Sequence, residues 1–122
     1  MSMEFEFSVT AHGCGFILLT PRGAASAEQI EQMYQAAFDI ADSTSNYRLL
    51  VDMMATELAY PMDHFLPLMQ RVSPYLSRFR TARLIGQESF RHHLVETVSQ
   101  KSAFSLKNFE DRQAAIDWLL VE

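Results

Sequence analysis

Residues 47–65 read YRLLVDMMATELAYPMDHF, and this stretch decides the fold. Its apolar run of Leu49, Leu50 and Val51 stops at Asp52, which is the pattern of a buried strand that ends at the edge of a sheet. Asp63 is a suitable cap for a helix that follows the strand. Because open α/β sheets place ligands at the carboxyl ends of their strands, the segment after Asp52 is the first candidate for a site.

Periodicity divides the rest of the chain into strands and helices. Strands are predicted over residues 4–9, 14–20, 47–53, 82–86 and 104–109, and helices are predicted after Ser26, after Asp63, over residues 88–101 and over residues 111–121. The first two strands form a hairpin, and residues 21–23, Pro-Arg-Gly, are expected to end the second. Ser26 and Gln29 have the spacing of a capping box.

Two prolines fall in the second predicted helix. Pro67 lies in the first turn, where a missing N–H is tolerated, whereas Pro74 is expected to kink or restart the helix. The element order β-β-α-β-α-β-α-β-α predicts an α/β fold with a single mixed β-sheet of about five strands and covering helices. At 122 residues the chain is expected to be one domain.

Composition restricts the function classes. Ten basic and fifteen acidic residues give a net charge of −5, which disfavours binding to nucleic acid because the field needed to attract phosphates is absent. A single cysteine excludes an internal disulfide and fits a reducing compartment. With no secretory leader and no apolar run long enough to span a bilayer, a cytoplasmic protein without an integral membrane segment is predicted.

The element order and two short motifs resemble the SpoIIAA-like, or STAS-like, small α/β domains. The resemblance covers the whole chain, and it rests on the strand RLLVDM and on the ending NFEDRQAAIDWLL. In that ending, an apolar residue, an acidic turn and an Ala…Trp-Leu helix correspond to Phe109, Glu110, Asp111, Ala115, Trp118 and Leu119. The resemblance implies the SpoIIAA-like fold and a regulatory role.

Classical members of this fold are anti-sigma-factor antagonists that are switched by phosphorylation of a serine. The resemblance places that serine after the third strand, in a sequence of the type Asp-Ser-Ser/Thr-Gly. In this chain the corresponding region reads DMMATE over residues 52–57, so that region has no Asp-Ser pair, and its only nearby hydroxyl is that of Thr56. The chain is therefore more similar to SpoIIAA-like proteins that lack the switch serine.

Acid–base chemistry has few candidates. Asp52, Glu57, His64 and the turn at residues 86–89 could converge at one edge of the sheet, although Asp52 equally fits a loop-capping role. No catalytic residue is predicted, and a small hydrolase or transferase that uses Asp52 and His64 is a distant alternative. No metal is predicted, because adjacent histidines at positions 92 and 93 diverge on a helix, and no cofactor is predicted. Cys14 is expected to be a small packed strand residue.

The segment after the third strand combines methionines with arginines. Arg71, Arg78, Arg80 and Arg83 fall in a segment without acids, so they either meet an acidic or phosphorylated partner or pair with acids of the first helix or of a second subunit. Methionine and leucine side chains in the same segment suit an adaptable apolar surface. The candidate binding surface comprises Asp52, Met53, Met54, Thr56, Glu57, Met62, His64, Phe65, Leu66 and Arg71.

These patterns predict a non-enzymatic regulatory or protein-interaction domain. It is expected to bind a protein partner through the exit of the third strand and the second helix, and homodimerisation through the same apolar region is a further prediction. The alternative is a binder of a small apolar or lipid-like ligand.

Overall fold

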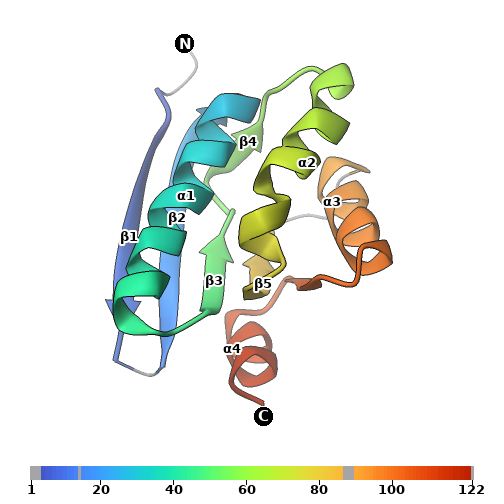
Figure 1. Cartoon of the computed structure of the whole chain (residues 1–122). Helices are drawn as coiled ribbons and strands as arrows, with labels where there is room; N and C mark the ends of the chain where they lie inside the picture. Colours follow the sequence, from blue (N-terminus) through green and yellow to red (C-terminus); the bar gives the residue numbers. More distant parts are fainter. Residues whose placement is uncertain (1–3, 14, 87–89, 122) are drawn as a thin grey trace.

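A computed structural model describes residues 4–13, 15–86 and 90–121 of the chain. The described elements are β1 (Glu6–His12), β2 (Phe16–Ala25), α1 (Ala27–Thr44), β3 (Arg48–Asp52), β4 (Thr56–Leu58), the 3-10 helix η1 (Met62–His64), α2 (Phe65–Leu76), β5 (Arg80–Leu84), α3 (Phe90–Lys101), β6 (Ser105–Phe109) and α4 (Arg112–Leu120). Figure 1 shows their arrangement, with α1 and α2 side by side in front of the sheet.

The strands form one mixed sheet of the predicted class. Its order is β1-β2-β3-β5-β6, and β4 pairs with β2 beyond the end of β3. β1 and β2 are antiparallel, whereas the remaining pairs are parallel. The carboxyl ends of β3, β4, β5 and β6 therefore point to the same edge of the sheet.

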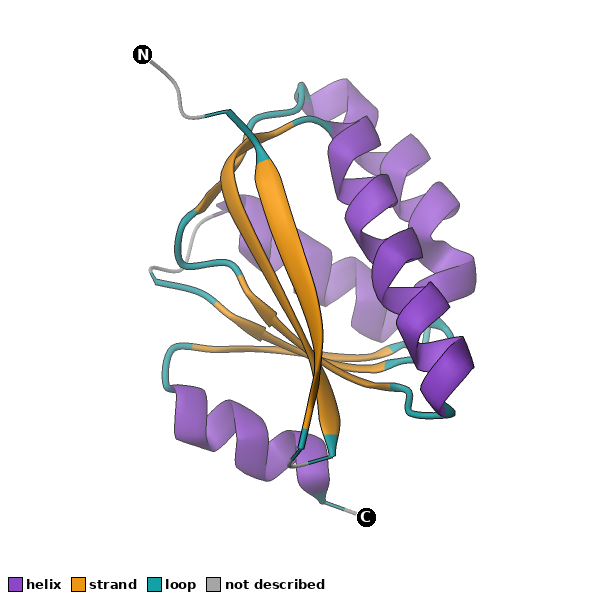
Figure 2. Cartoon of the chain, turned by 90° about the vertical axis from the view of Figure 1, so that its left-hand side faces the viewer, coloured by secondary structure: helices purple, strands orange, loops and turns teal. Residues whose placement is uncertain are grey.

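Helices cover the two faces of the sheet unequally. The larger core packs α1, α2 and α3 on one face, around buried side chains such as Leu19, Met33 and Val51. The smaller core packs α4 on the other face, around Leu50, Ala82 and Leu119. Figure 2 shows α4 alone beneath the lower part of the sheet, opposite the long helices.

Most predicted elements are present, and the first helix begins as expected. The Ser26 hydroxyl accepts from the Gln29 N–H at 3.2 Å, and the Gln29 side chain accepts from the Ser26 N–H at 2.9 Å. The predicted capping box is therefore confirmed. Pro67 lies in the first turn of α2, as expected, and α2 continues past Pro74 to Leu76 without a restart.

Three local predictions are wrong. β2 does not end at Pro21 but continues to Ala25. Pro21 falls between the β2 residues that pair with β3 and those that pair with β4, so its missing N–H breaks no hydrogen bond to either strand. Asp63 lies inside η1, and α2 begins after His64 without a side-chain cap. The segment expected as a loop after β3 contains β4, a sixth strand of three residues.

Candidate functional site

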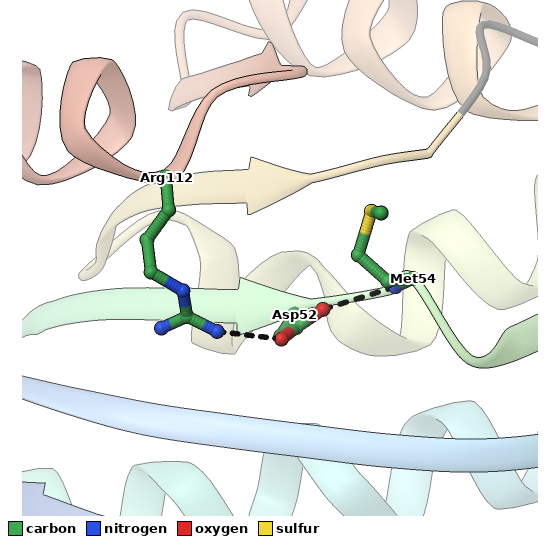
Figure 3. Close-up of polar contacts among 3 residues, drawn as sticks. All are labelled: Asp52, Met54 and Arg112. Carbon is green, nitrogen blue, oxygen red and sulfur yellow. Dashed lines mark hydrogen bonds and ion pairs between the residues drawn. The ribbon is translucent and has the colours of Figure 1, made fainter.

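Asp52 is the last residue of β3, and its carboxylate is occupied on both sides (Figure 3). One oxygen accepts from the Met54 N–H at 3.0 Å, which closes the turn after the strand. The other accepts from the Arg112 guanidinium at 2.7 Å, which fastens the first residue of α4 to the sheet. Asp52 therefore holds the strand exit and the last helix together, as the loop-capping role requires.

An open cleft of about 620 Å³ lies at the same edge of the sheet. Beyond the end of β3, β2 pairs with β4 at residues 23–25. On the other side of β3, the pairing with β5 ends at Leu84. The sheet consequently opens between β4 and the exit of β5. The cleft is lined by Met53, Met54, Thr56, Glu57, Leu58, Gly86, Arg91 and His92.

The start of α3 closes one side of the cleft. The Arg91 guanidinium donates to the Tyr60 carbonyl oxygen at 2.6 Å and lies 5.0 Å from the centre of the Tyr60 ring. The Met54 thioether lies against Gly86: a Cβ added to Gly86 would lie 3.4 Å from the sulfur and the methyl carbon of Met54. These contacts join the exits of β3, β4 and β5 into one surface.

Beneath the cleft lies a buried arginine that the sequence patterns did not single out from its neighbours. Arg83 of β5 is only 2% exposed, and its guanidinium donates to Asn108 Oδ1 at 3.0 Å. A second guanidinium nitrogen lies 2.8 Å from His92 Nδ1. Burial and the nearby Arg83 charge lower the pKa of His92 to about 4, so His92 is neutral near pH 7 and its Nδ1 can accept.

Behind α2 the core is almost solid. A cavity of about 20 Å³ remains there, lined mainly by apolar side chains together with Tyr34, Tyr60 and Arg83. Such a volume holds about one water molecule. Burial raises the pKa of both tyrosine hydroxyls, so they are neutral near pH 7. This core has no room for a lipid-like ligand.

The structure divides the predicted surface residues into two groups. Met53 and Phe65 are buried in the main core, and Thr56 is partly buried. Glu57, His64 and Arg71 are exposed, and Met54, Met62 and Leu66 are exposed to 56%, 42% and 63%. Neither Asp52 nor His64 lines the cleft among the described residues, so the acid–histidine pair of the catalytic alternative is not assembled there. Of the turn at residues 86–89, only Gly86 lies within the described residues.

One exposed apolar residue was missed by the sequence patterns. Phe90, the first residue of α3, is 69% exposed and directly precedes the cleft residues Arg91 and His92. Phe90 was not among the predicted surface residues. The available signal was its place near the start of the helix predicted over residues 88–101.

The arginines of the acid-free segment make contacts inside the chain. Arg71 lies 3.3 Å from the Glu31 carboxylate of α1. Arg78 donates to the Tyr47 hydroxyl at 2.8 Å, and Arg80 donates to the Trp118 carbonyl oxygen and stacks 3.8 Å from the Trp118 ring centre. Arg71 therefore pairs with an acid of the first helix, as one alternative expected, whereas Arg78, Arg80 and buried Arg83 bind neutral groups inside the chain.

The described residues contain neither a metal-binding cluster nor a helix that could span a membrane. Across residues 4–13, 15–86 and 90–121, no three histidine, cysteine or acidic side chains are grouped so that they could hold a metal ion. In the same residues no helix combines the length and the apolar character that a membrane span requires. Cys14 lies outside the described residues.

Comparisons with solved structures identify the fold. The chain is similar to an uncharacterised protein of Shewanella loihica with a SpoIIAA-like fold, at 16% identity and a TM-score of 0.64, over 98% of this chain and 95% of that one. It is also similar to an anti-sigma factor antagonist from Mycobacterium paratuberculosis, at 14% identity and a TM-score of 0.64, over 95% and 94% of the two chains.

A third similar structure is the Bacillus cell fate determinant SpoIIAA in its phosphorylated form. Here the identity is 13% and the TM-score 0.56, over 93% of this chain and 99% of that one. No family model and no curated protein matches the chain. The chain therefore has the SpoIIAA-like fold, and the predicted resemblance is confirmed at that level.

Proposed function

We propose that this chain is a non-enzymatic regulatory domain that binds a protein partner at the edge of the sheet where β3, β4 and β5 end. The main support for this proposal is the position of the exposed apolar side chains. Among the described residues, six large apolar side chains are exposed, and four of them follow these strands. These four, which we call the apolar rim, are Met54, Met62, Leu66 and Phe90.

Contacts inside the chain support treating the apolar rim as one surface. Met54 and Arg91 line the same cleft, and Phe90 is the residue before Arg91. Arg91 in turn binds the carbonyl oxygen of Tyr60, and Met62 of η1 follows Tyr60 closely along the chain. Leu66 lies one turn further on in α2, where it also borders a hollow between α2 and the end of α3. Exposed apolar side chains surrounded by Glu57, His64 and Arg91 have the composition of a protein interface, in which a polar margin surrounds apolar contacts.

The class of partner follows from the character of the surface. Methionine and leucine side chains adapt to another protein, whereas the 20 Å³ cavity behind α2 leaves the apolar-ligand alternative without an enclosed site. One similar structure is named an anti-sigma factor antagonist, which is a protein that acts on another protein. The proposed function is of the same class, without the switch serine, and in the cytoplasm, where a lone cysteine stays reduced.

Affinity capture with matched variants tests this proposal. The tagged chain is incubated with an extract of its source organism, and captured proteins are identified by mass spectrometry. Met54→Glu and Leu66→Glu should each weaken capture of the same protein by about tenfold or more, because a buried carboxylate would be left without a partner in the interface. Thermal unfolding of each variant verifies that the fold is intact.

Val121→Glu is the matched control. Val121 is 59% exposed and directly follows the last residue of α4. In Figure 1, α4 lies at the opposite end of the molecule from β4. The proposal requires that this control captures the partner like the unchanged chain. Equal capture by all variants would contradict it. If the captured protein were the chain itself, and capture were lost in Met54→Glu, the apolar rim would be a homodimer interface instead.

A further inference from the structure

We propose that the edge strand β1 pairs with β1 of a second copy of this chain, antiparallel and about a two-fold axis at Val9. The two six-stranded sheets would then form one continuous sheet. This homodimer interface lies at a different edge from the apolar rim, and it does not depend on the proposed function.

β1 is the open edge of the sheet. Its seven residues pair with β2 in an unbroken register, from Glu6 opposite Arg22 to His12 opposite Phe16. No described strand lies beyond it, and it contains no proline. Because alternate residues of an antiparallel edge strand direct their N–H and C=O groups outward, β1 presents a template for another strand.

The opposite edge of the sheet is protected. β6 has five residues, and the backbone N–H of Asn108 is already occupied by the Glu96 carboxylate of α3 at 2.6 Å. Helices contact β6 on both faces, α3 on one and α4 on the other. A second copy therefore has one long, unblocked strand edge available among the described elements.

The side chains of β1 and of Phe5, the residue before it, leave an apolar face incompletely covered. Phe5 and Val9 are only partly buried against the core below α1, and Phe7 is 36% exposed. The Phe5 and Phe7 rings lie 6.0 Å apart, so they form a small apolar strip at the sheet edge. α1 and β1 of a second copy would extend the cover over this strip.

The other face of β1 is polar. Ser8 and Thr10 are exposed there, and the Glu6 carboxylate forms an ion pair with Arg22. This face needs no covering helix, and α4 lies instead over β3, β5 and β6. Glu6, the one acid of β1, is already paired with Arg22, so pairing of two β1 strands would bring no unpaired carboxylate into the interface.

Self-complementarity identifies a second copy as the occupant. A two-fold axis at Val9 places Val9 opposite Val9 of the second copy, Phe7 opposite its Ala11 and Ser8 opposite its Thr10. Apolar positions then meet apolar positions on the α1 face, whereas a slip by one residue would mix the two faces. The strand pair forms about six to eight backbone hydrogen bonds.

The expected dimer is weak. A seven-residue strand pair is a small interface, and each copy carries a net charge of −5 that opposes association. A dissociation constant on the order of 10 μM fits these features. Sedimentation velocity over about two orders of magnitude in protein concentration measures it directly.

Paired substitutions test both the interface and its register. Ser8→Lys with Thr10→Lys places like charges opposite each other across the two-fold axis, and should raise the dissociation constant by about tenfold or more. Ser8→Lys with Thr10→Glu places opposite charges there and should lower the constant below that of the unchanged chain. Both positions are exposed, so the fold should be retained, and circular dichroism verifies this.

The matched control is Gln113→Lys with Ala114→Lys, which adds the same charge at exposed positions of α4. It should dimerise at least as tightly as the unchanged chain, because two added lysines reduce the net negative charge that opposes association. The proposal is overturned if the unchanged chain stays monomeric throughout, or if the two double variants that carry Ser8→Lys dimerise equally. A dimer lost in Met54→Glu but insensitive to the β1 changes would assign the interface to the apolar rim and would also overturn it.

Discussion

At the residue scale, Asp52 shows how a conspicuous acid at a strand end can be structural. Its two carboxylate oxygens bind the Met54 N–H and the Arg112 guanidinium, so the side chain bridges β3 and α4. That side chain is largely buried, whereas the Arg112 side chain is about half exposed, so the ion pair itself is of moderate strength. Asp52 should therefore stabilise the fold through both of its interactions, the hydrogen bond from the Met54 N–H and the ion pair with Arg112.

A double-mutant cycle measures this link. Asp52→Ala and Arg112→Ala should each lower the free energy of unfolding by about 1 kcal/mol, because each removes the charge-assisted hydrogen bond. The coupling energy between the two changes should be about 0.5 to 1 kcal/mol in urea unfolding. Glu110→Ala, an exposed change beside α4, serves as the control. Strictly additive effects would contradict the bridging role.

His92 gives the stability a pH dependence. Its pKa is lowered from 6.5 to about 4 by burial first and by the Arg83 charge second, so the unfolded chain takes up this proton before the folded chain does. The stability that neutral His92 contributes is therefore complete above pH 6.5, and it is lost progressively as the pH falls to about 4.

His92→Asn should flatten this part of the pH profile, because asparagine can accept from Arg83 without titrating. The measurement is the free energy of urea unfolding at several pH values between 6.5 and 4. His64→Asn, an exposed histidine change, should retain the slope of the unchanged chain. An equal slope in His92→Asn would show that the titration of another group is responsible.

The sequence could suggest Asp52 but not the role of Arg83. The position of Asp52 followed from an apolar run that ends in an acid, although its partner Arg112 is sixty residues away along the chain. Arg83 is buried because Asn108 of β6 and His92 of α3 converge on it. No local pattern encodes that convergence, since it depends on how three elements pack.

At the element scale, two helix ends contain a left-handed residue that is not glycine. Ser45 follows α1 with φ of 56°, and Ala103 follows α3 with φ of 63°. A side chain at such a φ costs free energy that glycine avoids. At both positions the helix ends in the left-handed conformation that is common at helix ends, but with a serine or an alanine in place of the usual glycine.

Ser45→Gly and Ala103→Gly should each raise the free energy of unfolding, by about 0.5 to 1 kcal/mol. The backbone hydrogen bond from Ser45 to the Ala41 carbonyl oxygen does not involve the side chain, so it should be retained. Ser43→Gly, within α1, should instead lower the free energy by a similar amount. Urea unfolding at constant pH compares the three variants, and destabilisation by both terminal glycines would contradict the left-handed geometry.

Elements with long periodic patterns were predictable, and short or interrupted ones were not. α1 has a capping box and a regular buried face, and both are legible in the sequence. β4 has three residues, which is too short for an alternating pattern. β2 passes through Pro21 only because its two parallel neighbours leave that position unpaired, a property of the sheet rather than of the local sequence.

At the scale of the whole molecule, the fold class was predictable because the order of elements carries it. The hairpin followed by strand–helix units gives the mixed sheet, and the similar solved structures have the same fold at 13% to 16% identity. The candidate surface was only partly predictable. Met53 and Phe65 are buried in the core, whereas Phe90 joins the exposed side chains from α3.

The two proposals assign different edges of the sheet to different partners. The carboxyl-end edge carries the apolar rim for a protein partner, and β1 is left for a second copy. A dimer through β1 would leave both apolar rims accessible. The unit that binds the partner would then be bivalent, which increases the avidity for an oligomeric partner.

Amide hydrogen exchange of the chain with its captured partner tests the central claim most directly. Binding at the apolar rim should slow exchange at residues 54–66 and 90–92, whereas exchange at α4 should be unchanged. Slowed exchange confined to β1 or α4, with residues 54–66 unaffected, would contradict the proposed binding surface.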